Sequence, residues 1–584
     1  MLRKKRALAT AVLFLGMFLV LLARLIDIQL VRTESFSKYH LNLLEESVKQ
    51  RVQSITLDDG RGKFYDRTGA PINHKAVPAL ILFPFLNEMA WPIEKVSAIA
   101  GVDEFSLSKQ LKGAKKPFVL TEGGKPLPLS EKQMETINAL KIPGVFAAFR
   151  LMPMDKLIAP QLLGGLTLSK EIKEKRYGKR HLASEVKVGD KGLQEQLDEF
   201  LLSDGESKLV YHVDGMGGPL FGVDIKYLAP GNPLYPVKVK TTLDQRLQEA
   251  AEEAVEENHI QKGGLILIDI ESSEIRASVS RPAFTKGQDP NKGDGAKNKM
   301  VQQAALGSVF KTVVAAAAIE ENLVDDAMTF NCNETIQGTQ EKERPLGLLH
   351  FGDSFAQSCN KTFGDLAISL SKKDPGLLEK YAEKLQLVGQ SGWNGNVYHS
   401  RVVQLYGEEF GRVWLEGASK QEEKLVAQTA IGQQDVQVSP LGAANMMATI
   451  ARGGERRMVK AVSRIDFANG TTAASFKEDQ QKGASISHST ALKLQQLLAS
   501  VVSTPKGTAA LLQSLPFQVA GKTGTAQTNK EKQQLNMWFA GYFPADHPKY
   551  AIAAVRLEAQ QDDRSATRLV ADFLTKVSKL EDLP

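Results

Sequence analysis

The chain has 584 residues, of which 42% are apolar, and this is enough to fill the cores of two or more domains. Its 73 basic and 67 acidic residues nearly balance, and the formal net charge of +6 is spread without a long run of like charge. That pattern gives no indication of nucleic-acid binding. The sequence contains no cluster of ligand residues typical of a metal site, so we expect no metal.

A basic segment followed by an apolar one opens the chain. Arg3-Lys-Lys-Arg6 precedes an apolar run from Ala7 to Ala23, which as a helix rising ~1.5 Å per residue spans roughly 25 Å, the lower limit for crossing a bilayer. A cleaved signal peptide is the alternative, but the run is longer than a usual signal core and no convincing cleavage site follows. We therefore predict one uncleaved transmembrane anchor within residues 1–32, with its basic end in the cytoplasm.

Between the anchor and residue 235, glycines mark several turns. They stand in Gly60-Arg-Gly-Lys-Phe-Tyr-Asp-Arg-Thr-Gly69, in Leu162-Leu-Gly-Gly165 and at Gly189 and Gly192. Residues 192–202 have the apolar spacing of an amphipathic helix. Taken physically, these features indicate structure and no particular chemistry.

Further along, Ser308-Val-Phe-Lys311 is the first of three short strings that bear on chemistry. Gly307 precedes it, and an Ala-rich apolar run follows, which predicts a buried helix capped by Ser308. Lys311 lies one turn beyond Ser308 on the same face, so we expect its amine to reach the serine oxygen. Other Ser-x-x-Lys strings occur, so this one is weak alone.

The other two strings follow in order. Ser358-Cys-Asn360 places a hydroxyl and an amide two positions apart in a segment that we expect to be a loop between helices. Lys522-Thr-Gly-Thr525 is the only Lys-Thr-Gly in the chain, and it lies in a predicted strand with glycines where something approaches the backbone closely. A cation and a hydroxyl on such a strand suit a substrate carboxylate.

Together these strings have the order found in penicillin-binding proteins and class A β-lactamases. The flanking segments from Val237 to the C-terminus strengthen the resemblance to the transpeptidase domain of penicillin-binding proteins. They are a strand and helix from Val237, a hairpin at Gly264–Ile270 and Glu274–Ser280, a helix start after Gly432-Gln…Ser439-Pro, and strands from Trp538 and Tyr550. The segment from Gly60 also resembles the start of the non-catalytic pedestal of class B members.

By this resemblance, we expect a multidomain α+β protein with one N-terminal transmembrane helix. The transpeptidase domain, at residues 236–584, is then a five-stranded antiparallel sheet flanked by helices. A mixed α/β pedestal, similar to the family's dimerisation domain, occupies residues 33–235. The chain is accordingly placed in the bacterial cell membrane, with its catalytic domain outside the cytoplasm.

The resemblance also implies an activity, that of a monofunctional serine D,D-transpeptidase that cross-links peptidoglycan stem peptides and is acylated by β-lactams. It needs no cofactor. Ser308 would be the nucleophile, Lys311 its base and Ser358 a proton relay, and Asn360 would orient the substrate amide and the Lys311 side chain. The strand residues Lys522, Thr523, Gly524 and Thr525 would bind the substrate, with the N–H groups of Ser308 and Thr525 facing the oxyanion.

Several alternatives stay open at this level. A D-Ala-D-Ala carboxypeptidase or a β-lactamase-like enzyme shares the three strings, and a non-catalytic scaffold for cell-wall synthesis is the rival of another class. Other wall-synthesis proteins are candidate partners, but the sequence identifies none. Cys332 and Cys359 can form a disulfide outside the cytoplasm, although an unpaired buried thiol at Cys359 is at least as compatible with the motif.

Overall fold

The structure, a computed structural model, describes residues 2–36, 42–43, 51–178, 180, 182, 185–202, 205–214, 217–220, 225–284, 293–477, 483–529, 533–560 and 565–580. Contacts divide the chain into two compact units. The first comprises residues 1–61, 74–153 and 203–233, and the second comprises residues 62–73, 154–202 and 234–584. The pedestal and transpeptidase boundaries predicted from the sequence stay a prediction, because residues 62–73, 154–202 and 234–235 of the predicted pedestal pack within the second unit.

The N-terminal helix α1 (Leu2–Ile26) contains the whole predicted apolar run and passes into a π-helical turn, η1 (Asp27–Val31). Every described side chain from Arg3 to Ile26 is exposed. Such an apolar surface is unfavourable in water but suits a lipid environment. Residues Arg3–Val31 are long and apolar enough to cross a membrane, as a membrane anchor requires.

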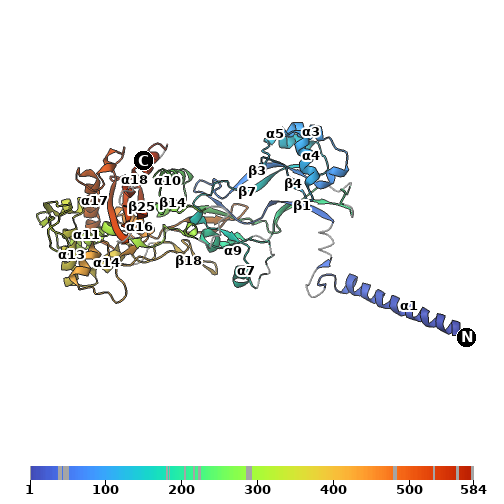
Figure 1. The fold of residues 1–584 in the computed structure, drawn as a ribbon, viewed down its shortest axis with the longest axis horizontal. Coiled ribbons are helices and arrows are strands. Elements are labelled where there is room, and N and C mark those ends of the chain that lie inside the picture. Colours follow the sequence, from blue (N-terminus) through green and yellow to red (C-terminus); the bar gives the residue numbers. More distant parts are fainter. Residues whose placement is uncertain are drawn as a thin grey trace. The chain divides into compact units, whose positions relative to one another are not determined.

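The remainder of the first unit combines small antiparallel sheets with short helices (Figure 1). One sheet has the order β1–β10–β11 and another the order β4–β3–β7, and β5 pairs with β6. The strands are β1 (Val52–Asp58), β3 (His74–Leu82), β4 (Phe118–Val119), β5 (Thr121–Glu122), β6 (Lys125–Pro126), β7 (Val145–Pro153), β10 (Ser207–His212) and β11 (Lys226–Leu228). The helices are η2 (Pro84–Glu88), α3 (Ile93–Ala100), α4 (Glu104–Gly113) and α5 (Glu131–Ala139). A separate apolar core, including Leu80, Phe83 and Leu107, holds them together.

The second unit contains a mixed four-stranded sheet of order β2–β12–β21–β22 and a set of short elements. These are β2 (Lys63–Tyr65), α6 (Pro160–Leu163), β8 (Leu166–Thr167), α7 (Lys170–Tyr177), β9 (Val188–Gly189), α8 (Gly192–Gln196), α9 (Asp198–Leu201), β12 (Lys238–Thr241), β21 (Val462–Asp466) and β22 (Thr472–Ser475). The predicted single helix over 192–202 is wrong, because the chain breaks at Leu197 into α8 and α9. At this break the buried Asp198 carboxylate accepts hydrogen bonds from the Gly189 N–H and the Tyr177 hydroxyl.

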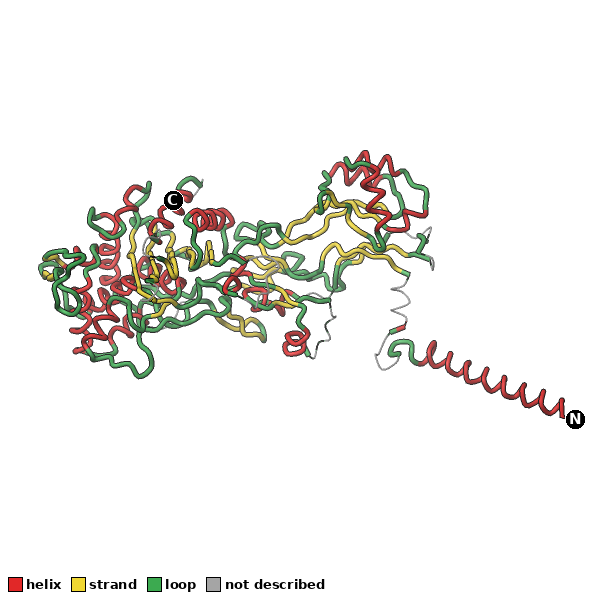
Figure 2. The backbone as a smooth tube through the Cα atoms, in the orientation of Figure 1, coloured by secondary structure: helices red, strands yellow, loops and turns green. Residues whose placement is uncertain are grey.

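The main sheet of the second unit has five strands in the order β14–β13–β25–β24–β23, all antiparallel. Figure 2 draws the strands in yellow and the helices in red. They are β13 (Gly263–Asp269), β14 (Glu274–Arg281), β23 (Ala520–Asn529), β24 (Gln534–Phe543) and β25 (Tyr550–Ala559). The predicted five-stranded antiparallel sheet is therefore confirmed. Because side chains alternate between faces, the nearly complete burial of β13 and β25 means that both faces are covered.

Helices supply that cover. α10 (Gln245–Glu257) and α18 (Ala566–Val577) pack on each other and on the sheet, and α16 (Pro440–Ala451) packs on β13, β24 and β25 (Figure 1). The remaining helices are α11 (Lys311–Glu320), α12 (Phe351–Ala356), α13 (Asn360–Lys373), α14 (Leu377–Lys384), α15 (Glu423–Ala430) and α17 (His488–Ser503), with 3-10 turns η3 (Asp294–Ala296), η4 (Gly307–Phe310) and η5 (Ala510–Ser514). Three small hairpins or bridges complete the unit: β15 (Ala304–Ala305) with β20 (Gln437–Val438), β16 (Thr329–Asn331) with β17 (Leu348–His350), and β18 (Asn394–Val397) with β19 (Ser400–Val403). The edge strand β23 contacts both α17 and η4, so the predicted site strings of η4 and β23 are adjacent.

Candidate active site

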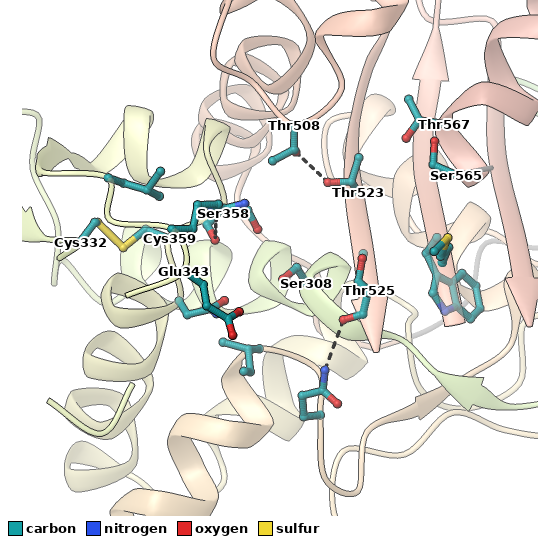
Figure 3. Close-up of a pocket in the computed structure, with 18 of the residues that line it drawn as sticks. Ser308, Cys332, Glu343, Ser358, Cys359, Thr508, Thr523, Thr525, Ser565 and Thr567 are labelled. Atoms are coloured by element: carbon teal, nitrogen blue, oxygen red, sulfur yellow. Dashed lines mark hydrogen bonds between the residues drawn. A yellow bond between two sulfur atoms is a disulfide. The ribbon is translucent and has the colours of Figure 1, made fainter. Parts of the chain in front are cut away.

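The three strings predicted from the sequence converge on one cleft of about 590 Å³ in the second unit (Figure 3). Its walls come from η4, from the turn between α12 and α13, and from the edge strand β23. Six of the predicted site residues line it, namely Ser308, Ser358, Asn360, Thr523, Gly524 and Thr525. The other two, Lys311 and Lys522, are completely buried. All eight therefore belong to one site or to the protein interior directly behind it.

Ser308 lies in the 3-10 turn η4, and α11 begins three residues later at Lys311. The expectation that Ser308 caps the helix is wrong, because neither η4 nor α11 has a side-chain cap. The preceding residue, Gly307, has φ +64°, and a Cβ there would lie 2.5 Å from the carbonyl oxygen of Thr525. Glycine thus lets the turn that carries Ser308 pack directly against the backbone of β23.

A second glycine, Gly432, packs against Gly307. Gly307 N–H donates to the carbonyl of Gly432 at 2.9 Å. A Cβ on Gly432, whose φ is +71°, would lie 1.9 Å from the Gly307 oxygen. Next to it, Gln433 donates its side-chain amide to the carbonyl of Thr525 at 3.3 Å and lines the cleft. Gly432 and Gln433 therefore help to build the site, although the sequence indicated them only as part of a helix start.

Ser358 occupies the turn at the end of α12 and has a left-handed φ of +59°. Its N–H donates to Phe355 at 3.1 Å, and the next N–H, of Cys359, donates to Ser354 at 2.8 Å. This pair of bonds is the Schellman motif, in which glycine is the usual residue at the left-handed position. A serine there costs ~1–2 kcal/mol relative to a right-handed conformation. Its hydroxyl is thereby directed to the buried Lys311 amine.

The Lys311 amine is held by the second string. It donates to the Ser358 carbonyl at 2.8 Å and to Asn360 Oδ1 at 2.7 Å, and it lies 3.0 Å from Ser358 Oγ. Among the residues that the structure describes, these are its hydrogen-bond partners, and Ser308 is not one of them. The pKa of Lys311 is lowered well below its ordinary value, chiefly by burial and then by the positive charges of Lys522 and Arg344.

Lys522 is the second buried cation of the site. Burial, assisted by the charge of Arg344, lowers its pKa from 10.5 to about 7. Its amine lies 5.7 Å from the centre of the Phe355 ring, and that of Lys311 lies 5.6 Å from the Phe363 ring. These rings stand on α12 and α13, on either side of the Ser358 turn. Each amine therefore lies near an aromatic ring, in addition to its hydrogen bonds to neutral oxygens.

The hydroxyls on β23 alternate with its buried residues. Thr523 and Thr525 point toward the cleft (Figure 3), while Lys522 and Gly524, which directly precede them in the strand, are buried. Thr523 donates to the hydroxyl of Thr508 at 2.7 Å, and Thr508 also lines the cleft. A Cβ on Gly524 would lie 2.6 Å from the Leu306 carbonyl, so this glycine also keeps η4 close to the strand. Thr508 joins the site from the segment before β23, a position that its sequence did not single out.

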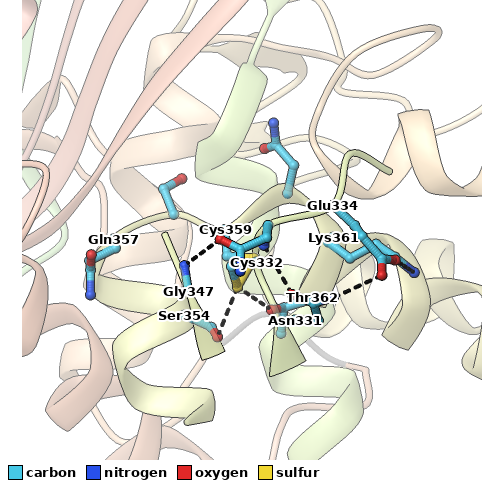
Figure 4. The surroundings of a disulfide bond; sticks show 12 residues. Asn331, Cys332, Glu334, Gly347, Ser354, Gln357, Cys359, Lys361 and Thr362 are labelled. Carbon is cyan, nitrogen blue, oxygen red and sulfur yellow. Dashed lines mark hydrogen bonds and ion pairs between the residues drawn. A yellow bond between two sulfur atoms is a disulfide. The ribbon is translucent and has the colours of Figure 1, made fainter. Parts of the chain in front are cut away.

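Arg344 and the two cysteines complete the wall next to Ser358. The Arg344 guanidinium donates to the Gln357 carbonyl at 2.6 Å. Cys332 and Cys359 form a disulfide, which decides the question that the sequence left open (Figure 4). It spans a sequence separation of 27, and closing a loop of that length stabilises a fold by ~3–4 kcal/mol in the chain-entropy description.

Comparisons with known proteins identify the family of the chain. The family model described as the penicillin binding protein transpeptidase domain matches residues 263–575, more than half of the chain. The peptidoglycan D,D-transpeptidase PbpA of Mycobacterium tuberculosis is 26% identical over 395 residues, which are 61% of this chain and 74% of the relative. Penicillin-binding protein H of Bacillus subtilis is 25% identical over 475 residues, 71% of this chain and 61% of the relative.

Two longer matches extend over nearly the whole chain. The peptidoglycan D,D-transpeptidase MrdA of Acinetobacter baumannii is 22% identical over 584 residues, 92% of this chain and 82% of the relative. A solved structure titled "Structural coordination of polymerization and crosslinking by a peptidoglycan synthase complex" aligns with a TM-score of 0.67 and 23% identity, covering 98% of each chain, and so shares the fold. The chain therefore belongs to the penicillin-binding protein transpeptidase family, and within it to the class B proteins.

Proposed function

We propose that this protein cross-links peptidoglycan stem peptides as a serine D,D-transpeptidase, with Ser308 as the nucleophile. The observation that carries the proposal is the buried Lys311 amine, which is held by Ser358 and Asn360 one helical turn from Ser308. A serine hydroxyl is a poor nucleophile unless a neighbouring base accepts its proton. A lysine with a strongly lowered pKa supplies such a base near neutral pH.

The hydrogen bonds of Lys311 fit a neutral amine. Two of its three contacts, the Ser358 carbonyl and Asn360 Oδ1, only accept hydrogen bonds, so they take the two N–H groups of a neutral amine. The third contact, the Ser358 hydroxyl, can instead donate to the amine lone pair. Ser358 is thus connected to the base and lines the cleft, and we assign it the transfer of the proton to the departing amine.

Substrate recognition uses the other side of the cleft. The terminal carboxylate of a D-Ala-D-Ala stem would accept hydrogen bonds from Thr523 and Thr525 and would lie close to Lys522. A carboxylate favours the charged form of a nearby amine, so binding would raise the pKa of Lys522 from about 7 and draw a proton from solvent. Asn360 would bind an amide of the stem from the opposite wall.

The reaction then follows in two steps. Ser308 Oγ attacks the carbonyl carbon of the penultimate D-Ala, the peptide C–N bond breaks, and the terminal D-Ala leaves with the proton from Lys311 through Ser358. The oxyanion would accept hydrogen bonds from the N–H groups of Ser308 and Thr525, two backbones that Gly307 allows to approach closely. Such fixed donors contribute about 3 kcal/mol each. An amine of a second stem then attacks the carbonyl carbon of the acyl ester and forms the new amide bond. The ester C–O bond breaks, and the proton lost by the amine passes to Ser308 Oγ, which frees the enzyme.

A carboxypeptidase differs from a transpeptidase only in using water, not an amine, as the acceptor of the acyl group. A β-lactamase likewise hydrolyses the acyl ester on its serine. The sequence between Asn360 and Lys522 has no Glu-x-x-Leu-Asn string like that of class A lactamases. We therefore favour an amine acceptor. β-Lactams would acylate Ser308 as covalent inhibitors, because their carboxylate and amide resemble the D-Ala-D-Ala terminus.

Location and partners complete the proposal. We infer that α1 anchors the protein with Arg3-Lys-Lys-Arg6 in the cytoplasm, because basic flanks favour that side. The catalytic unit would then lie outside, where a disulfide such as Cys332–Cys359 persists. Other cell-wall synthesis proteins are proposed partners, since the structural neighbour comes from a peptidoglycan synthase complex.

The test is a product analysis. The full-length chain is incubated with uncross-linked peptidoglycan strands bearing pentapeptide stems, the strands are digested with a muramidase, and the fragments are weighed by mass spectrometry. We expect cross-linked dimers together with free D-Ala, and neither product from the Ser308→Ala variant. Tetrapeptide monomers without dimers would identify a carboxypeptidase instead, and intact pentapeptides would support the scaffold.

A further inference from the structure

The Cys332–Cys359 disulfide joins the catalytic turn to a separate hairpin (Figure 4). Cys359 stands between Ser358 and Asn360, the two residues that hold the Lys311 amine. Cys332 follows directly after β16. Both cysteines line the cleft, yet they are only 2% and 3% exposed. The covalent bond is therefore part of the active-site wall.

The turn that carries Cys359 has residue types that are not the preferred ones at the end of α12 and the start of α13. Ser358 adopts the left-handed conformation that usually requires glycine. Cys359 is the N-cap residue of α13, where serine, threonine, aspartate or asparagine is preferred, and it makes no side-chain cap bond. Two successive residues thus depart from what local helix chemistry favours. Another interaction has to compensate if this turn is to keep one conformation.

The hairpin on the other side of the bond is well ordered. Cys332 N–H donates to the Gly347 carbonyl at 2.8 Å, and Leu346 N–H donates back to the Cys332 carbonyl at 3.2 Å. Cys332 Sγ also lies 3.7 Å from Ser354 Oγ on α12 and 3.5 Å from Thr362 Oγ1 on α13, hydroxyls that can donate to it. Cys332 Sγ therefore contacts both helices that flank the Ser358 turn.

Resting on the function proposed above, we propose that the Cys332–Cys359 disulfide is a positioning element that holds Ser358 and Asn360 against Lys311. Without it, the turn would be free to leave its strained conformation and the amine would lose its two acceptors and its hydroxyl partner. Water would then reach Lys311, and its pKa would rise toward the ordinary value. Ser308 acylation would become slower, and its pH dependence would move upward. The carboxylate-binding residues on β23, which the disulfide does not touch, would be unaffected.

The alternative is a disulfide that only stabilises the fold. The two roles differ in what they do to the folded enzyme, so acylation by a fluorescent penicillin is measured on the full chain in saturation kinetics over pH 6–10. Such kinetics separate the dissociation constant of the initial complex from the rate constant of acylation. The samples are the oxidised protein, the protein reduced with dithiothreitol, and the double variant Cys332→Ala/Cys359→Ala with and without dithiothreitol. Reduction gives two thiols, with two electrons and two protons supplied as dithiothreitol closes to its ring disulfide.

We expect reduction and the double variant each to lower the acylation rate constant at least tenfold at pH 7. The pH of half-maximal rate should rise by at least one unit, and the dissociation constant should rise by a smaller factor than the rate constant falls, because the carboxylate contacts on β23 are retained. Dithiothreitol should have no effect on the double variant, and reoxidation should restore the rate of the native sequence. Near-UV circular dichroism identifies the folded fraction, and rates are expressed per folded molecule.

An acylation rate constant within twofold of the oxidised value, or a slower rate with an unchanged pH profile, would overturn the inference. If the double variant does not fold, the Cys332→Ser variant, which keeps the Ser358-Cys-Asn360 string, and the reduced native protein provide the same comparison. Failure of the proposed function gives a different result, since the oxidised protein would then form no Ser308 adduct at all.

Discussion

Replacing Lys522 with methionine should stabilise the protein most strongly in acid, although we place this residue in substrate binding. Lys522 is completely buried, and its pKa is lowered from 10.5 to about 7. At 1.36 kcal/mol per pH unit, keeping this amine charged in the fold costs about 5 kcal/mol. Methionine has a similar length and carries no charge, so the Lys522→Met variant avoids that cost. Of the contacts described above, it loses the 3.4 Å hydrogen bond to the Thr523 carbonyl, about 1 kcal/mol, and the approach of the charged amine to the Phe355 ring.

The pH dependence gives this prediction its sign. Between pH 7 and 10.5 the unfolded chain binds the Lys522 proton and the folded chain does not, so the native protein gains stability as pH rises. The cost of the buried charge is therefore complete below pH 7 and disappears above pH 10.5. From this linkage we expect the advantage of the variant to shrink by about 2–3 kcal/mol between pH 6 and pH 9.

The assay is urea unfolding of both proteins at pH 6 and pH 9, followed by circular dichroism. Lys493→Met on α17 is the matched control, since Lys493 is exposed and its replacement should give no pH-dependent difference. The acylation rate of Lys522→Met with a carboxylate-bearing penicillin should fall at least tenfold at pH 7. A variant that is less stable than the native protein at pH 6, or one whose advantage is the same at both pH values, would refute the reasoning.

Three further predictions concern the cleft. Gly307→Ala should lower the free energy of unfolding by about 2–3 kcal/mol and slow acylation at least tenfold, because its Cβ would lie 2.5 Å from the Thr525 oxygen. The control Gly338→Ala, at φ +76° in open space, should lower the free energy of unfolding in urea by about 1 kcal/mol and leave acylation unchanged. Equal effects of the two variants would contradict the packing argument. Ser358→Gly should leave the free energy of unfolding within about 1 kcal/mol of the native value, because glycine suits the left-handed turn. Penicillin acylation should fall about a hundredfold or more. Loss of stability with normal acylation would show that the serine is structural. The penicilloyl ester on Ser308 should persist for many minutes after free drug is removed, as followed by intact mass, and rapid turnover with bulk penicillin hydrolysis would instead place the protein with the β-lactamases.

Much of the second unit could be predicted from its sequence. The apolar, β-branched runs that became β13, β14 and β25 predict strands, although β14 lies at the edge of the sheet and is not a central strand as its composition suggested. Ser439-Pro440 marks the start of α16, whose N-cap is Ser439. These signals are local, because each depends on residues that are neighbours in the chain. The three strings of candidate site residues were recognisable for the same reason, and the structure brings them together.

What the sequence could not predict depends on contacts between distant segments. Gly432 fits against Gly307 only because β15 and β20 pair, and Thr508 reaches Thr523 only because its segment packs beside β23. The disulfide depends on the 5.9 Å between two Cα atoms that are separated by a hairpin, a distance that spacing does not reveal. The division of residues 33–235 between two units is likewise a matter of packing.

The central claim, that Ser308 is the acylated nucleophile, is tested most directly by mass spectrometry of the full-length protein after incubation with penicillin. We expect a single adduct equal to the mass of the drug, located by peptide mapping on the fragment that contains Ser308, and no adduct on the Ser308→Ala variant. An adduct on any other serine, or folded native protein that stays unlabelled, would contradict the account.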